Sequence, residues 1–75
     1  MELNKFVTLF SEQFDNTSSD QFSPDTAFRA LDEWGSLTAL SIIAMVDEEM
    51  EVRITGADIR SCETIEDLFK LAQTK

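Results

Sequence analysis

The stretch LDEWGSLTALSIIAMVDEEM, residues 31–50, decides the fold because a polar loop gives way within it to an amphipathic helix. From Ser36 onward, apolar residues recur at spacings of three and four, which is the period of an α-helix. The spacing predicts a helix from Ser36 to Met50. Its core-facing stripe consists of Ala39, Ile42, Ile43, Val46 and Met50.

The same helix carries a second face, because several apolar and acidic side chains fall well off the core stripe on a helical wheel. These side chains are Leu37, Leu40, Ser41, Ala44, Asp47 and Glu48. One interpretation is that this face contacts a partner. The other is that these are scattered surface residues, or that Leu40 packs beneath the long loop before the helix.

An N-terminal helix is predicted from Leu3, Phe6, Val7, Phe10 and Phe14, which form one stripe, and it is expected to end near Asp15. The connection from there to Ser36 is about twenty residues long, which is unusual in a compact domain unless the loop is ordered or functional. We expect an ordered loop, held onto the helices by Phe22, Phe28 and Leu31. Ser23-Pro24 is expected to start one short helical turn.

Two capping boxes mark the remaining helix starts, TGAD at residues 55–58 and TIED at residues 64–67. The first begins a short helix that carries Ile59 and Cys62. The second begins a helix whose apolar stripe is Ile65, Leu68, Phe69 and Ala72. The predicted fold is therefore all-α, a small four-helix bundle with three main helices, one short helix and a long ordered loop between the first and second helices.

Composition favours one folded domain, residues 1–75, because 43% of the residues are hydrophobic and six are Phe. Six basic and fifteen acidic residues give a net charge of −9, which disfavours binding to nucleic acid and favours protein partners with basic patches. The N-terminus has no secretory pattern and no stretch is apolar enough to span a membrane, so we expect a cytoplasmic protein. Cys62 is the only cysteine and is expected to be a small buried hydrophobe.

Several kinds of chemistry are disfavoured by the residues that the chain lacks. Without histidine, a Ser-His-Asp relay cannot form and a catalytic zinc site would lack its usual ligands. Gly35 and Gly56 are far apart, so there is no phosphate-binding glycine loop. An EF-hand aligned on Asp15 would have Asp20 at the glycine position. We therefore rank an enzyme last, and expect no catalytic residues and no metal site.

The region from Asp25 to Ile54 resembles the centre of the acyl carrier protein family, the phosphopantetheine-binding carriers of fatty-acid, polyketide and related pathways. Members have an Asp-x-x-Phe-x-x-Leu loop, then Asp-Ser-Leu at the start of the second helix, and an acidic helix end. The matching residues here are Asp25, Phe28, Leu31, Ser36, Leu37, Asp47, Glu48 and Glu49. Helix order, length and charge agree over essentially the whole chain.

The resemblance implies that a phosphopantetheinyl transferase attaches 4′-phosphopantetheine to Ser36, and that the protein then carries acyl groups as thioesters. It also implies a docking face for acyl-loading and acyl-processing enzymes with basic patches, formed by Leu37, Leu40, Ala44, Asp47 and Glu48. We expect a monomer. From the residues alone, Ser36 has another interpretation as an ordinary N-cap serine, whereas a phosphodiester at a helix N-terminus is favoured by free amides and the helix dipole.

Gly35 departs from the family pattern, which has Asp before the attachment serine and uses it for recognition by the transferase. Two hypotheses follow. The chain is a carrier that is modified slowly or selectively, with Asp32 and Glu33 replacing some negative charge, or it is a carrier-like interaction module that is no longer modified. Trp34, beside the site, is either an exposed contact for a partner or an anchor of the loop.

Overall fold

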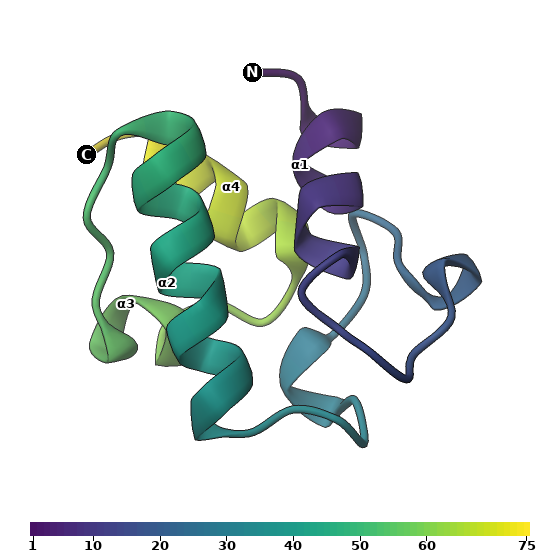
Figure 1. The fold of residues 1–75 in the computed structure, drawn as a ribbon. Coiled ribbons are helices and arrows are strands. Elements are labelled where there is room, and N and C mark those ends of the chain that lie inside the picture. Colours follow the sequence, from purple (N-terminus) through teal and green to yellow (C-terminus); the bar gives the residue numbers. More distant parts are fainter.

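The computed structural model describes residues 1–75 and contains only helices and connecting loops (Figure 1). The α-helices are α1 (Leu3–Ser11), α2 (Ser36–Met50), α3 (Gly56–Arg60) and α4 (Ile65–Gln73), and the 3₁₀ turns are η1 (Ser19–Gln21) and η2 (Phe28–Ala30). Helix α4 contacts α1, α2 also contacts α1, and α3 lies against α2 and α4. This arrangement confirms the predicted small all-α bundle.

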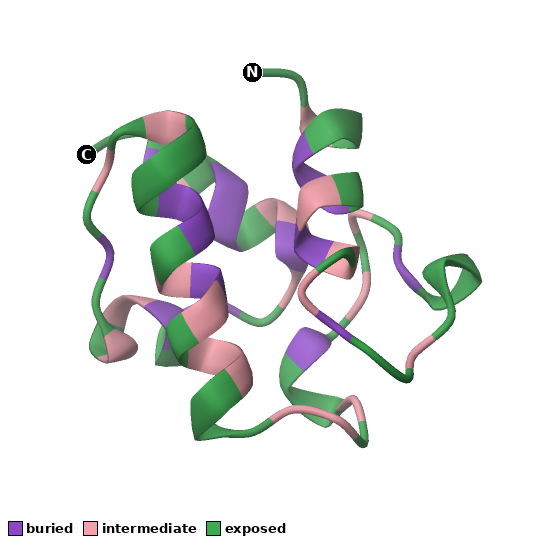
Figure 2. Cartoon of the chain, viewed as in Figure 1, coloured by how far each residue is buried: buried purple, intermediate pink, exposed green.

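The core consists of sixteen buried residues, all apolar, which come from the four α-helices, from η2 and from the connecting segments (Figure 2). No buried side-chain polar atom lacks a hydrogen-bond partner. The short helix α3 ends at Arg60, so Cys62 lies two residues beyond it and not within it, contrary to the prediction. Cys62 is buried, as expected, and this burial raises the pKa of its thiol. No helix is both long enough and apolar enough to cross a membrane.

Helix α1 ends at Ser11, four residues before the predicted end near Asp15. The Ser11 hydroxyl donates to the Thr8 carbonyl at 2.7 Å, which satisfies an acceptor at the end of the helix. The chain then continues in tight turns, with the Phe14 amide donating to the Ser11 carbonyl at 3.1 Å. These turns keep Phe14 in the core although it lies outside the helix.

Helix α2 has the predicted bounds, but the buried part of its stripe differs from the prediction. Ile42 and Val46 are fully buried, as expected, and Met45 is also buried although it was not assigned to the core. Ala39, Ile43 and Met50 are only partly buried. The side of α2 that faces the core is therefore rotated toward Met45, since burial depends on where the other helices lie.

Helices α3 and α4 begin at the two predicted capping boxes, which are both present. The Asp58 amide donates to the Thr55 hydroxyl at 3.1 Å, and the Asp67 amide donates to that of Thr64 at 3.1 Å. The Asp67 carboxylate accepts a hydrogen bond from the Thr64 amide at 3.2 Å, and this hydrogen bond is the main cause of the lowered pKa of Asp67. At Asp58 the main cause of the lowered pKa is the hydrogen bond from Lys75.

The connection between α1 and α2 is ordered by aromatic packing and by hydrogen bonds to α4. Phe22 and Phe28 are buried and Leu31 is half-buried, as predicted. The ring of Phe28 lies 5.4 Å from that of Phe10, measured between centroids. The Glu66 amide donates to the Pro24 carbonyl at 3.0 Å, so the loop also satisfies the start of α4.

The expected helical turn at Ser23-Pro24 is wrong. These residues form a tight turn in which the Thr26 amide donates to the Ser23 carbonyl at 3.1 Å. The Thr26 hydroxyl accepts from the Ser23 amide at 2.8 Å and donates to the Gln21 carbonyl at 3.0 Å. The hydroxyl of Thr26 thus links residues within the segment 21–26. The 3₁₀ turns η1 and η2 lie on either side of the Ser23-Pro24 turn.

Candidate functional site

Ser36 is the first residue of α2 and is exposed. Gly35 precedes it in an extended conformation, with φ −170° and ψ −176°, and provides no side-chain cap. The first α2 amide with an acceptor is that of Ala39, which donates to the Gly35 carbonyl at 2.9 Å. The three amides of residues 36–38 therefore have no acceptor within the chain.

This helix start suits an anionic group on the Ser36 hydroxyl. Unpaired amides at the N-terminus of a helix donate to phosphate oxygens, and the helix dipole places partial positive charge at the same point. Nothing lies within 4 Å of the position that a Cβ atom on Gly35 would occupy, so the approach to Ser36 from that side is open. The residues present thus fit a phosphate-linked group attached to Ser36.

A groove runs beside Ser36 between α2, α3 and η2, with a volume of about 510 Å³. We call it the Ser36 groove. Its apolar lining residues are Trp34, Ala39, Leu40, Ile43 and Ile59, and its remaining lining residues are Arg29, Gly35, Ser36, Gly56 and Arg60. Ala39 and Ile43 pack against the edge of the core and also line this groove, which explains why both are only partly buried.

Trp34 anchors the loop before α2 to the aromatic core. Its ring meets that of Phe28 edge-on, with centroids 5.0 Å apart, and is stacked 6.4 Å from that of Phe14. Trp34 remains half-buried, and its free side forms part of the wall of the Ser36 groove. Of the two interpretations from the sequence, the loop anchor is confirmed.

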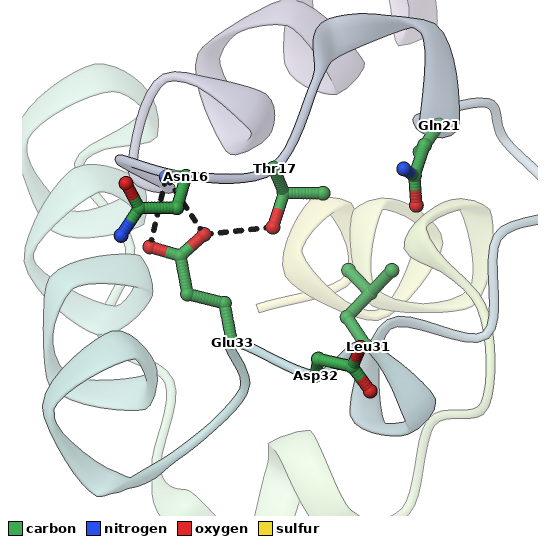
Figure 3. Close-up of a pocket in the computed structure, with 6 residues that line it drawn as sticks. All are labelled: Asn16, Thr17, Gln21, Leu31, Asp32 and Glu33. Carbon is green, nitrogen blue, oxygen red and sulfur yellow. Dashed lines mark hydrogen bonds between the residues drawn. The ribbon is translucent and has the colours of Figure 1, made fainter.

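Glu33 fixes the last residues before α2, a role that the sequence did not reveal. Its carboxylate accepts from the Thr17 hydroxyl at 2.7 Å and from the Asn16 amide at 3.0 Å (Figure 3). It also accepts from the Asp15 amide at 2.9 Å. The Thr17 hydrogen bond is the main cause of the lowered pKa of Glu33. The donors lie sixteen to eighteen residues earlier in the chain, so no local motif indicates them.

A second pocket, of about 350 Å³, surrounds this carboxylate. Figure 3 shows its lining residues, Asn16, Thr17, Gln21, Leu31, Asp32 and Glu33. Glu33 points toward Asn16 and Thr17, whereas the adjacent Asp32 is exposed and makes no hydrogen bond that the structure records. The two acids expected to replace the carboxylate that Gly35 lacks thus have different roles, because the Glu33 carboxylate holds the loop.

The second face of α2 is exposed along its length. Leu37 and Leu40 have 80% and 60% of their surface accessible, and they are the most exposed large apolar residues of the chain. Ala44, Asp47 and Glu48 continue the same face and are also exposed. Leu40 therefore does not pack beneath the loop, contrary to one of the two interpretations, and instead forms the rim of the Ser36 groove.

The acidic end of α2 is solvated. Asp47, Glu48 and Glu49 are exposed and form no ion pair, and Glu51 ends the helix in a left-handed conformation with φ 56°. Its amide donates to the Asp47 carbonyl at 3.0 Å. No group of three or more His, Cys, Asp or Glu residues is arranged to hold a metal ion.

Comparison with known proteins gives a match to a family model described as a phosphopantetheine attachment site, over residues 4–71. The match spans η1, η2, α2 and α3 completely, and most of α1 and α4. No curated protein and no solved structure matches the chain.

Proposed function

This chain belongs to the phosphopantetheine attachment family, and we propose that it is an acyl carrier protein with Ser36 as the attachment residue. Members of the family carry 4′-phosphopantetheine covalently on a serine. Carrier domains of this family are generally not catalytic, and we propose that this chain is not an enzyme. When bound, the arm supplies a thiol that carries acyl groups as thioesters.

The single observation that carries the assignment to Ser36 is its position at the start of the long helix α2, exposed and beside a groove. Other serines are placed differently. The hydroxyls of Ser11 and Ser61 each donate to a carbonyl of their own helix at 2.7 Å. Ser41 lies in the middle of α2 and is half-buried, so it has no free helix amides beside it.

The residues around Ser36 have distinct roles in this proposal. The free amides of residues 36–38 bind the phosphate, and the open position at Gly35 gives a modifying enzyme access to the hydroxyl. Leu40 and Ile43 offer apolar surface to the attached group and exclude water from part of it. Glu33 and Trp34 hold the preceding loop, so that the hydroxyl has a fixed position.

The exposed face of α2 is the proposed docking site for partner enzymes. Leu37, Leu40 and Ala44 provide apolar contacts, while Asp47 and Glu48 match a basic patch. The partners are a phosphopantetheinyl transferase and acyl-loading and acyl-processing enzymes. We propose that residues 1–75 form one carrier domain, which is a monomer in the cytoplasm and does not bind nucleic acid.

Intact-mass measurement tests the attachment. The protein is incubated with a phosphopantetheinyl transferase of broad specificity, Mg²⁺ and coenzyme A. We expect a gain of one phosphopantetheinyl group in the wild type and in the control Ser41→Ala, and no gain in Ser36→Ala. A gain that persists in Ser36→Ala would place the attachment on another serine.

Gly35 supports a second candidate function, a carrier-like interaction module that is poorly modified or unmodified. The backbone at Gly35 is extended and a Cβ atom there would meet nothing within 4 Å, so the fold does not impose glycine at this position. The lack of a carboxylate at position 35 is therefore not imposed by the backbone conformation or by packing. No mass gain in the wild type, together with a gain in Gly35→Asp, would favour this candidate.

A further inference from the structure

Two arginines lie in the Ser36 groove, although the chain has only six basic residues against fifteen acidic ones. Arg29 comes from η2 and Arg60 from α3, and both line the groove together with Ser36. The ion pairs of the chain lie elsewhere, between Lys70 and Glu66 at 3.5 Å and between Lys75 and Asp58 at 2.9 Å. Arg29 and Arg60 therefore have no carboxylate partner, although the chain has fifteen acidic residues.

A hydrogen bond holds Arg29 at the groove, whereas Arg60 is exposed and has no hydrogen bond or ion pair within the chain. The Arg29 Nε donates to the Cys62 carbonyl at 3.2 Å, which ties η2 to the end of α3 and leaves the two Nη groups without an acceptor. The Arg60 Nη1 lies 3.3 Å from the position that a Cβ atom on Gly56 would occupy. Arg60 therefore folds back over the first residue of α3, into space that a larger residue at position 56 would restrict.

The groove combines apolar walls with these guanidinium groups. Trp34, Leu40 and Ile43 suit a hydrocarbon chain. Free guanidinium donors suit an oxyanion, because their planar fork matches phosphate and carboxylate oxygens. The net charge of −9 repels free anions from solution. An anion tethered at Ser36 overcomes this repulsion, because tethering gives it a high local concentration beside the groove.

We infer that Arg29 and Arg60 bind an anionic group of the moiety attached to Ser36, either the phosphodiester of the arm or a carboxylate on the acyl cargo. The inference rests on the proposed function, and it adds that the carrier recognises an anionic group of the attached moiety. If the bound anion is the phosphodiester, the arginines hold the arm at the groove. If it is a carboxylate, they favour acyl groups that carry a second acid over neutral chains of similar length.

The first experiment follows the phosphodiester by ³¹P NMR of the modified protein, in which it is the only phosphorus. The variants are Arg29→Gln and Arg60→Gln, and the control is Arg53→Gln, which makes the same charge change at an exposed arginine outside the groove. Binding of the phosphodiester predicts a ³¹P shift in the groove variants that exceeds the shift in the control. Arg60→Gln removes no hydrogen bond within the chain, so it guards against loss of folding in Arg29→Gln.

The second experiment follows the cargo. The arm is loaded with a succinyl group ¹³C-labelled at its free carboxylate, or with the neutral butyryl group, and emission of Trp34 in the groove wall is recorded for both. Binding of the carboxylate predicts that succinyl changes Trp34 emission more than butyryl does. It also predicts that Arg60→Gln raises the midpoint of the ¹³C titration by about one pH unit, whereas Arg53→Gln does not.

The outcomes separate this inference from the proposed function. A response of either the ³¹P or the ¹³C signal to the groove variants, but not to Arg53→Gln, supports the inference and identifies the anion. A modified protein in which neither signal distinguishes the groove variants from the control overturns the inference alone. A chain that gains no mass on Ser36 overturns both.

Discussion

Position 35 has glycine where the acyl carrier family has aspartate, directly before the proposed attachment serine. The backbone there is extended and the space for a Cβ atom is free, so aspartate fits without strain. An aspartate at this N-cap position would accept a hydrogen bond from one of the free amides of α2 and place negative charge at the positive end of the helix.

We therefore expect Gly35→Asp to raise the free energy of unfolding by about 0.5 kcal/mol and to speed modification by the transferase. Urea unfolding measures the first effect, and the initial rate of mass gain measures the second. Gly35→Asn is the control, since it caps the helix without the charge. Equal modification rates in the wild type and Gly35→Asp would contradict the role of the carboxylate in recognition.

Glu33 is the residue whose ionisation stabilises the loop before α2. Hydrogen bonds from Thr17 and two amides lower its pKa below the usual value of 4.5. A carboxyl group with a lowered pKa in the folded state contributes stability above its unfolded pKa, and that stability is lost as the pH falls through the folded pKa. The contribution is therefore complete at neutral pH.

Glu33→Gln is expected to lower the melting temperature at pH 7, and the difference from the wild type should shrink as the pH falls below 4.5. Thermal unfolding followed by circular dichroism from pH 7 to pH 3 measures this. Asp32→Asn makes the same charge change on an exposed neighbour and should have little effect. A pH-independent difference for Glu33→Gln would show that the charge of Glu33 does not matter.

Helix α2 carries two sets of side chains, one that packs in the core and one that is exposed. Ile42, Met45 and Val46 are buried and hold the helix in the bundle, whereas Leu37 and Leu40 remain in solvent. Large apolar residues that stay exposed contribute little to folding, and side by side on one helix face they suit a protein contact. Stability and docking can therefore be separated by mutation.

Leu37→Ala and Leu40→Ala are each expected to change the free energy of unfolding by less than about 0.5 kcal/mol and to slow modification by the transferase. Ile42→Ala should lower the free energy of unfolding by about 2–4 kcal/mol, because it leaves a cavity in the core. Urea unfolding and modification rates test both statements. A large loss of stability in Leu40→Ala would show that this side chain supports the fold.

The contribution of charge on the docking face is tested in the same modification assay, with a matched control variant. Glu48→Gln should slow modification, whereas Glu12→Gln, the same change at an exposed residue just after α1, should not. Equal rates for the two variants would place the contact with the transferase elsewhere on the molecule.

At the scale of the whole molecule, the net charge of −9 is spread over a chain of 75 residues with few ion pairs. Asp47, Glu48, Glu49 and Glu51 lie close together in sequence at the end of α2 with no basic partner. Like charges at the end of a helix repel one another and oppose the helix dipole. The folded state therefore carries electrostatic repulsion that dissolved ions can screen.

We expect the melting temperature to rise between low and moderate salt, and to rise further with a divalent cation. The dependence on salt should weaken near pH 4, where many carboxylates are protonated. Thermal unfolding at several NaCl and MgCl₂ concentrations provides the test. A melting temperature that does not change with salt at pH 7 would argue against net repulsion.

Features that depend on near neighbours in the chain could be predicted from the amino-acid sequence. The bounds of α2 follow from apolar residues repeated at the helical period, and the starts of α3 and α4 follow from threonine and aspartate three residues apart. The burial of Phe22 and Phe28 was also predictable, because large aromatic residues in a polar loop are stable only against a core. Local reasoning also placed Ser36 at the start of α2, whereas its proposed role as the attachment residue came from the resemblance to the acyl carrier family.

Features that depend on residues distant in sequence could not be predicted and became visible in the folded structure. The early end of α1, the burial of Met45 and the exposure of Leu40 depend on how the helices and loop pack. Glu33 binds donors sixteen to eighteen residues away, and the Ser36 groove joins Arg29 from η2 to Arg60 from α3. Periodicity and capping fix the elements because their interactions are local, whereas these contacts form only when the packed helices bring separate segments together.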